Sequence, residues 1–178
     1  MTGENAHNIL ITGRPGVGKT TLVVALSREL SQARPTGFFT REIREREKRR
    51  GFALESLDGE RMTLAHTEFA HGPGVGKYRV DLPGFDAFLA RLEPEMRKAG
   101  LLVIDEIGKM ECLSPKFERL AKWALDAPAP LIATVAAKGG GLISEVKRRG
   151  DVRLSEVTEQ NRDHLREELE GSLASLLQ

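Results

Sequence analysis

The stretch ILITGRPGVGKTTL, residues 9–22, contains the pattern on which our prediction of the fold depends. It begins with a short apolar run and passes through a glycine-rich turn. Apolar residues then recur at helical spacing, at Leu22, Val23, Leu26 and Leu30. Strand, glycine loop and helix in this order are the context in which a phosphate-binding loop occurs. We therefore predict a buried strand, a loop that binds an anion, and a helix that continues to about Ala33.

The loop from Gly13 to Thr20, here named the phosphate loop, fits G-x-x-x-x-G-K-[ST] at every fixed position. Glycines allow the backbone to curl so that successive N–H groups point at an anion, and the start of the helix adds the positive end of its dipole. Lys19 would supply a positive charge to the β- and γ-phosphates, and the Thr20 hydroxyl would bind Mg²⁺. The nucleotide-binding residues predicted here are Gly13, Arg14, Pro15, Gly16, Val17, Gly18, Lys19, Thr20 and Thr21.

A second copy of PGVGK lies within the loop of residues 72–77, but without the flanking residues that the pattern requires. His71 stands at the position that corresponds to Gly13, and Tyr78 at the position that corresponds to Thr20. No apolar strand precedes this copy, and the sequence after it is typical of an extended segment. We interpret it as an ordinary glycine loop. Whether this loop contacts a nucleotide stays open at the level of sequence.

A second apolar run, LLVI at residues 101–104, ends in two adjacent carboxylates. In open α/β sheets, ligands bind at the carboxyl ends of the strands. Asp105 would therefore hold Mg²⁺ together with Thr20. Glu106 would be the general base that activates a water molecule, with Lys19 as the second catalytic residue. The nucleotide-binding residues predicted from this stretch are Leu101, Leu102, Val103, Ile104, Asp105, Glu106, Ile107 and Gly108.

Three further residues near these carboxylates have less specific patterns. Lys109 and Glu111 either contact the nucleotide or form an ion pair with each other near the site. Cys112 is the single cysteine of the chain, which excludes an internal disulfide and a metal site built from several cysteines. No catalytic partner pattern accompanies Cys112, so we interpret it as a small core residue.

The remaining patterns predict a mostly parallel sheet with an antiparallel insertion. Apolar runs at residues 131–136 and 152–157 alternate with helical patterns, which favours a parallel sheet with helices on both faces. Residues 36–82 contain strand patterns and an Asp-Gly turn signal, and we interpret them as an antiparallel meander. The charged residues 44–50 would lie between its first two strands. We predict one α/β domain over residues 1–178.

Local signals predict where loops and helices begin and end. Ser114 and Pro115 are typical of a helix start, with the serine as the cap and the proline in the first turn. Thr158 is expected to cap the last helix. Pro94 is expected to break or kink the helix that follows the meander. Residues 67–76 are expected to form a loop.

Composition excludes several classes of protein. The chain has 178 residues and a formal net charge of +1, so no global field attracts nucleic acid or an acidic membrane. Hydrophobic residues make up 40% and charged residues 30%, which is typical of a soluble globular protein. No apolar run is long enough to span a bilayer. We expect a cytoplasmic monomer that has no membrane or nucleic-acid partner.

Longer segments of the chain resemble a known family. VGKYRVDLPGFD, VIDEIGKME and VTEQNRDHL, together with the phosphate loop, resemble the small nucleoside-triphosphatases first described from thermophiles. The resemblance implies an ASCE-type P-loop fold, related to the AAA+ and RecA groups, and Mg²⁺-dependent hydrolysis of ATP, GTP and other nucleoside triphosphates. It also implies that the strand at residues 131–136 lies between the strands of the phosphate loop and of Asp105. Thr134 would then lie near the γ-phosphate, and Asn161 and Arg162 are further candidates for nucleotide contact.

Two alternatives stay open. A nucleotide or nucleoside kinase would share the phosphate loop and the metal site but needs an acceptor pocket, and Glu106 favours water as the acceptor. An RNA-associated NTP-binding protein would use the arginine-rich residues 41–50. Three glutamates dilute the charge of that segment, so we expect an exposed hairpin tip there instead: Glu42, Glu45 and Glu47.

Two further expectations concern the base and the catalytic machinery. The absence of an N-K-x-D motif argues against a guanine-specific switch and predicts loose base selectivity. A catalytic arginine in cis would speed hydrolysis, and the sequence offers three candidates for it: Arg14, Arg44 and Arg162.

Overall fold

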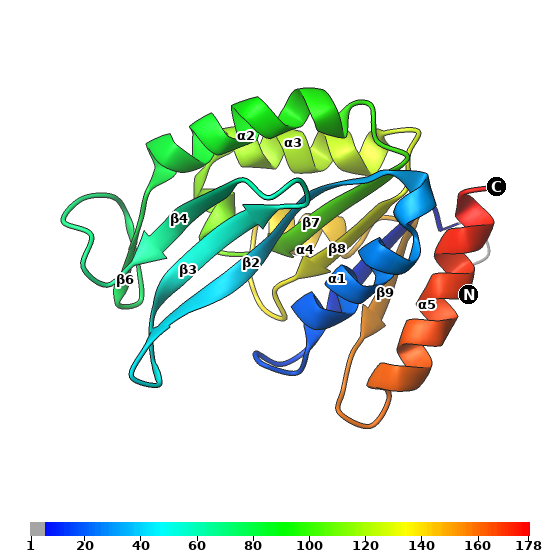
Figure 1. Cartoon of the computed structure of the whole chain (residues 1–178), viewed down its shortest axis with the longest axis horizontal. Helices are drawn as coiled ribbons and strands as arrows, with labels where there is room; N and C mark the ends of the chain where they lie inside the picture. The colour runs from blue at the N-terminus through cyan, green and yellow to red at the C-terminus, as the bar shows by residue number, and fades with distance from the viewer. Residues whose placement is uncertain (1–5) are drawn as a thin grey trace.

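Nine strands form one sheet in the computed structural model, which describes residues 6–178 (Figure 1). They are β1 (Asn8–Thr12), β2 (Pro35–Glu45), β3 (Lys48–Ser56), β4 (Arg61–His66), β5 (Gly74–Val75), β6 (Tyr78–Val80), β7 (Leu101–Ile107), β8 (Leu131–Val135) and β9 (Val152–Glu156). Their order across the sheet is β5-β6-β4-β3-β2-β7-β8-β1-β9. The meander is antiparallel, as predicted, and it extends the parallel sheet through β2, which pairs with β3 on one side and with β7 on the other.

The strands β2, β7, β8, β1 and β9 are parallel to their neighbours in this half of the sheet. Strand β8 lies between β1 and β7, as the family resemblance implied. Strands β1, β7 and β8 are buried along almost their whole length. Their continuous apolar sequences follow from this burial, because helices cover both faces of the sheet here.

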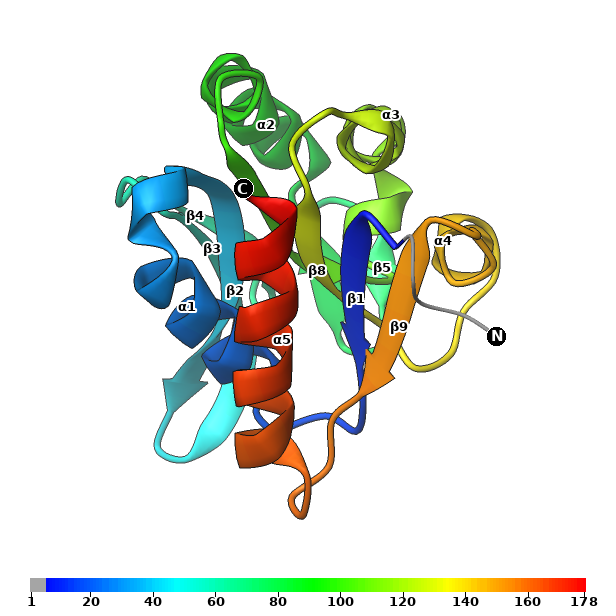
Figure 2. The same cartoon turned by 90° about the vertical axis from the view of Figure 1, so that its right-hand side faces the viewer.

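Five α-helices of residues 6–178 cover the two faces of the sheet (Figure 2). Helices α1 (Lys19–Glu29) and α5 (Arg162–Leu176) pack on one face. Helices α2 (Leu82–Met96), α3 (Pro115–Asp126) and α4 (Leu142–Val146) pack on the other, over a larger core that contains Phe38, Phe85, Phe88 and Phe117. The predicted fold class is confirmed. Among the helices of this part of the chain, none has both the length and the apolar character needed to cross a bilayer.

The sequence predicted that the charged residues 44–50 connect two strands. In the structure, these residues belong largely to the strands themselves. Strands β2 and β3 both extend into this segment, and only Arg46 and Glu47 form the turn. Their φ angles of 45° and 67° are typical of a two-residue hairpin turn. An ion pair between Arg49 and Glu42 joins the two strands. Charged pairs of this kind replace the apolar alternation by which a strand is detected in sequence.

Two helix boundaries also differ from the predictions. Helix α1 ends at Glu29, and a separate 3₁₀ helix, Ser31–Ala33, follows it before β2 begins at Pro35. Helix α2 is not broken at Pro94 but continues to Met96. The backbone hydrogen bond that Pro94 removes lies near the C-terminal end of α2, so most of the helix keeps its hydrogen bonds. The buried apolar face of α2 holds the helix against the sheet.

The predicted start of α3 is confirmed, whereas the predicted loop at residues 67–76 contains a short strand. Helix α3 begins as predicted, because the Ser114 hydroxyl accepts a hydrogen bond from the Phe117 N–H at 3.0 Å, and Pro115 occupies the first turn. The predicted loop at residues 67–76 contains β5, which pairs with β6. A strand of two residues has no periodicity by which the sequence could reveal it.

Gly37 provides a stability test of the contact between β2 and β7. It pairs with Val103, and a Cβ atom on Gly37 would stand 1.8 Å from the Val103 carbonyl oxygen. We expect Gly37→Ala to lower the free energy of unfolding by about 3 kcal/mol, because the paired backbone must move. Urea unfolding measures this difference. Gly171→Ala in α5 is the control, since nothing lies within 4 Å of its Cβ position, and it should keep or raise stability. Equal stability of Gly37→Ala and wild type would contradict this packing.

Candidate functional site

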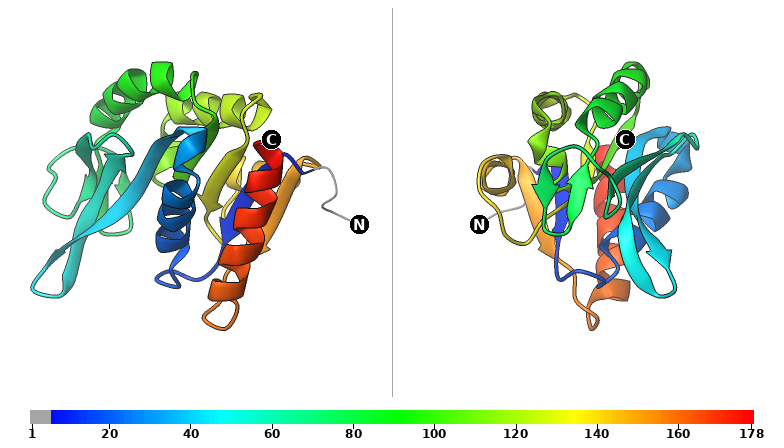
Figure 3. Two further views of the ribbon diagram at one scale, coloured as in Figure 1. Left: turned by 45° about the vertical axis from the view of Figure 1, so that its right-hand side comes forward. Right: turned by 90° about the vertical axis from the view of Figure 1, so that its left-hand side faces the viewer.

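Three segments project together from one edge of the sheet (Figures 1 and 3). They are the phosphate loop between β1 and α1, the turn of the β2–β3 hairpin, and the loop between β9 and α5. The carboxyl ends of β7 and β8 lie at the same edge, because both strands run parallel to β1. The site residues predicted from the sequence lie at the ends of these strands, so the fold brings them together at this edge.

The phosphate loop wraps around the side chain of Lys19. Gly16 and Gly18 have φ angles of 77° and 104°, a conformation that favours glycine. The Lys19 Nζ donates hydrogen bonds to the carbonyl oxygens of Gly13 and Arg14, both at 3.1 Å. Helix α1 starts directly after Gly18 without a side-chain cap, which leaves its first N–H groups available for an anion.

Asp105, near the end of β7, accepts hydrogen bonds from three threonines. The Thr20 Oγ1 lies 2.7 Å from Oδ2, the Thr134 Oγ1 lies 2.5 Å from Oδ1, and the Thr40 N–H donates to Oδ2 at 3.1 Å. Burial raises the pKa of Asp105, although these hydrogen bonds and the charge of Lys19 oppose the change. The sequence indicated Thr20 and Thr134 but not Thr40, which the pairing of β2 with β7 brings here from 65 residues away.

The half-buried carboxyl group of Glu106 and the buried one of Glu111 both lie close to Gly108. A Cβ atom on Gly108 would stand 2.7 Å from Glu106 Oε1 and 2.7 Å from Glu111 Oε2. Burial and then the charge of Asp105 raise the pKa of Glu106. Burial and then the charge of Glu106 raise the pKa of Glu111, which belongs to a short 3₁₀ helix, to about 8. The ion pairs of residues 6–178 include none between Glu111 and the exposed Lys109, so that predicted alternative does not form.

A cleft of about 480 Å³, here named the cleft, opens between the phosphate loop and the β2–β3 hairpin. Its lining includes seven residues that the sequence predicted: Pro15, Gly16, Gly18, Lys19, Thr20, Thr21 and Glu106. Four hairpin residues that it did not predict also line the cleft: Thr40, Glu42, Arg49 and Phe52. The register of β2 and β3 sets Glu42 opposite Phe52. No local sequence signal reveals such a register.

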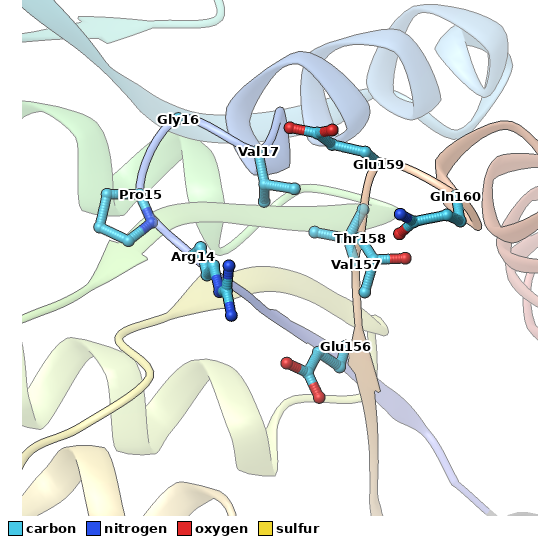
Figure 4. Close-up of a pocket in the computed structure, with 9 residues that line it drawn as sticks. All are labelled: Arg14, Pro15, Gly16, Val17, Glu156, Val157, Thr158, Glu159 and Gln160. Carbon is cyan, nitrogen blue, oxygen red and sulfur yellow. The ribbon is translucent and has the colours of Figure 1, made fainter.

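A second pocket, of about 490 Å³, adjoins the phosphate loop (Figure 4). The loop contributes Arg14, Pro15, Gly16 and Val17 to it, and the opposite wall consists of residues 156–160. Asn161 stands at the cap position of α5, where Thr158 was predicted. The side chains of Asn161 and Thr158 each accept a hydrogen bond from the other's backbone N–H, which closes a turn in front of the helix and explains this difference.

The other residues predicted to bind the nucleotide lie in the core or against the phosphate loop. Leu101, Leu102, Val103, Ile104 and Ile107 are fully buried. They hold the acidic end of β7 in place and do not reach the cleft surface. The Arg162 side chain lies against the phosphate loop, since its Nη1 would be 3.4 Å from a Cβ atom on Gly18.

A match to a family model agrees with this geometry. The NTPase model matches residues 8–170, which include both the phosphate loop and the acidic end of β7. The chain belongs to the NTPase family. The resemblance inferred from the motifs is therefore confirmed.

Several relatives of this NTPase-family chain are similar to it over most of their length. The nucleoside-triphosphatase THEP1 of Thermotoga maritima is 44% identical over 162 residues, which cover 90% of this chain and 92% of that protein. The cancer-related nucleoside-triphosphatase of Homo sapiens is 37% identical over 179 residues, which cover 90% of this chain and 93% of that protein. The crystal structure of THEP1 from Aquifex aeolicus superposes with a TM-score of 0.83 at 34% identity, over 93% of this chain and 98% of that one.

Glu111 of this NTPase-family chain should make its stability depend on pH. The pKa is about 8 in the folded protein, against an ordinary value of 4.5, so the folded state binds more protons between these values. The contribution of Glu111 to the free energy of unfolding should therefore be highest below pH 4.5. It should be lost progressively as the pH rises from 4.5 to 8, and should change little above 8. Glu111→Gln should remove this part of the decline, which amounts to about 3 kcal/mol between pH 6 and pH 9.

Urea unfolding of the nucleotide-free protein at pH 6 and pH 9 measures this effect. Glu167→Gln, on the exposed side of α5, is the matched control and should follow the wild type at both values. An unchanged difference between the two pH values in Glu111→Gln would show that this carboxyl group is not responsible.

Proposed function

We propose that this protein hydrolyses nucleoside triphosphates, including ATP and GTP, to the diphosphate and inorganic phosphate, with Mg²⁺ and with broad base specificity. The observation that carries the proposal is that Thr20 and Asp105, 85 residues apart, are hydrogen-bonded beside a cleft that Lys19 and Glu106 line. The relatives named as nucleoside-triphosphatases support the same activity.

Each residue has a defined part in the proposed reaction. The N–H groups of the phosphate loop and the Lys19 ammonium bind the β- and γ-phosphates. Glu106 accepts a proton from a water molecule while the water oxygen forms a bond to the γ-phosphorus. The bond between this phosphorus and the bridging oxygen breaks, and the diphosphate leaves with the bonding electrons. Because burial and the Asp105 charge raise the pKa of Glu106, its carboxylate is a stronger base than that of an exposed glutamate.

Thr20 and Asp105 are the residues proposed to hold Mg²⁺. This ion prefers oxygen ligands and usually takes only one or two of them from protein side chains, with water and phosphate oxygens completing the shell. A hydroxyl and a carboxylate oxygen that lie 2.7 Å apart at the start of α1 fit that preference. When bound, Mg²⁺ neutralises negative charge that develops on the phosphate oxygens.

The second pocket is the proposed place of the ribose and the base. It adjoins the phosphate loop, and its lining combines the apolar Val17 with the carboxyl groups of Glu156 and Glu159 (Figure 4). Carboxylates accept hydrogen bonds from ribose hydroxyls whichever base is attached. This composition supports broad base specificity. A cytoplasmic monomer that acts without a membrane or nucleic-acid partner stays a prediction from the sequence.

Phosphate release from a panel of nucleoside triphosphates tests the proposal. We expect release from purine and pyrimidine triphosphates without any added nucleoside, and loss of release when Mg²⁺ is chelated. Lys19→Ala protein, purified in the same way, reports any contaminating activity. Phosphorylation of an added nucleoside in place of phosphate release would contradict hydrolysis and favour a kinase.

A further inference from the structure

The cleft contains a second cation that the reaction above does not use. Arg49 of β3 lines the cleft together with Lys19, Thr20 and Glu106. It reaches this place because β2 and β3 continue beyond the end of β7, so that the hairpin stands beside the phosphate loop (Figure 1). The guanidinium group therefore borders the region proposed for the phosphates.

Three contacts hold this guanidinium group. Its Nε donates a hydrogen bond to the Tyr78 hydroxyl at 3.0 Å, and its Nη1 donates to Glu42 Oε1 at 2.7 Å. The group also lies over the Phe52 ring, 5.2 Å from the centroid. The hydrogen bond to Glu42, and then that to Tyr78, raise the pKa of Arg49 further, so the group stays charged. Within residues 6–178 its Nη2 has no hydrogen-bond partner and is available for a phosphate oxygen.

The three arginines that the sequence indicated lie elsewhere. Arg14 lines the second pocket. Arg44 is hydrogen-bonded within the hairpin itself. Arg162 packs against the phosphate loop. Among the described residues, the cleft that holds Glu106 is lined by a single arginine, Arg49.

We propose that Arg49 is a further catalytic residue, which donates hydrogen bonds to the γ-phosphoryl group during its transfer, and that Glu42 and Tyr78 position it. The inference rests on the proposed hydrolase function. During transfer, negative charge spreads over the phosphoryl, attacking and leaving oxygens. A cation that is already held in place stabilises this transition state more than it stabilises the bound substrate. Tyr78 follows the second PGVGK copy, so the residue that excludes this copy as a phosphate loop contributes to the cleft by holding Arg49.

Arg49→Ala and Arg49→Lys test this inference against the neighbouring control Arg50→Ala. Arg50 lies on the same strand, but it pairs with Glu45 and Glu68 and is not a lining residue of the cleft. For Arg49→Ala we expect kcat for phosphate release to fall about 10²-fold, while the Kd of ATP changes less than about threefold. Arg49→Lys keeps the charge but loses the fork geometry, and its kcat should fall by about tenfold or more. Arg50→Ala should match the wild type.

A transition-state analogue separates a catalytic contribution from a structural one. ADP with aluminium fluoride mimics the phosphoryl group in transfer. Arg49→Lys should bind ADP as the wild type does, but should lose affinity for the aluminium fluoride complex in proportion to its loss of kcat. Tyr78→Phe should share this pattern with a smaller factor. Thermal unfolding checks that each variant is folded, and Arg49→Lys, which can retain the pairing with Glu42, carries the test if Arg49→Ala does not fold.

Three results would overturn the inference. Wild-type kcat in both Arg49 variants, with an active wild-type enzyme, would reject it and leave the proposed hydrolase function intact. An equal loss of ATP affinity and of affinity for the analogue would show ground-state binding in place of catalysis. A wild-type protein that releases no phosphate from any nucleoside triphosphate would overturn both this inference and the hydrolase function.

Discussion

Replacing Glu106 by glutamine is expected to lower kcat for phosphate release by about 10³-fold, with little change in the Kd of ATP. Glutamine has nearly the same size but cannot accept the proton of the attacking water. The phosphate loop and the hydrogen bonds to Asp105 do not involve the Glu106 side chain, so nucleotide binding should persist. Single-turnover phosphate release and equilibrium titration with a fluorescent ATP analogue measure the two quantities separately.

Stability provides an internal check on this variant. Burial and the Asp105 charge both disfavour the ionised form of Glu106, so Glu106→Gln should be at least as stable as the wild type at neutral pH. A loss of activity in a fully folded protein then reports chemistry. Glu167→Gln, on the exposed side of α5, should leave turnover unchanged. If Glu106→Gln kept more than about a third of the wild-type kcat, a different group would have to be the base.

Replacing Lys19 by alanine is expected to reduce kcat/KM for phosphate release by at least 10²-fold, and to weaken ATP binding by about tenfold. The Lys19 ammonium lies inside the curl of the phosphate loop, where it donates to the Gly13 and Arg14 carbonyl oxygens. Bound phosphates would provide stronger, charged acceptors at the same place. Both affinity and turnover should therefore fall, in contrast to Glu106→Gln. Titration with ATP and steady-state phosphate release distinguish the two patterns.

The second PGVGK copy supplies the matched control for this variant. Lys77 occupies the same place in the pentapeptide, but its Nζ lies over the Tyr78 ring, 5.4 Å from the centroid, and it is not a lining residue of the cleft. Lys77→Ala should therefore change ATP affinity by less than about twofold, because solvent screens a charge that lies outside the cleft. A larger loss would show that the loop of residues 72–77 contributes to nucleotide binding. Wild-type ATP affinity in Lys19→Ala would remove the basis for the proposed phosphate site.

Some parts of the fold could be predicted because their causes are local. The glycines of the phosphate loop, the Ser114 cap and the buried runs of β7 and β8 depend on residues within a few positions of one another. Backbone conformation and helix capping act over that range, so sequence alone indicates them. The alternation of apolar strands and helices then favours a parallel sheet, and adjacent strand ends place Lys19 and Glu106 on one edge.

Other features depended on partners that are distant in sequence. Helix α2 tolerates Pro94 because its apolar face packs on the sheet. In the charged part of the hairpin, ion pairs of Arg49 with Glu42 and of Arg50 with Glu45 join the two strands. Local propensity argues against both structures, and tertiary contacts decide them.

The sequence by itself determined the mostly parallel α/β architecture and the four residues proposed for the reaction, Lys19, Thr20, Asp105 and Glu106. Only the tertiary structure decided what surrounds them. Thr40 reaches Asp105 from 65 residues away, and Arg49 meets Tyr78 across the meander. The physical reason is that the register between strands follows from the packing of the whole sheet, and no short segment encodes it.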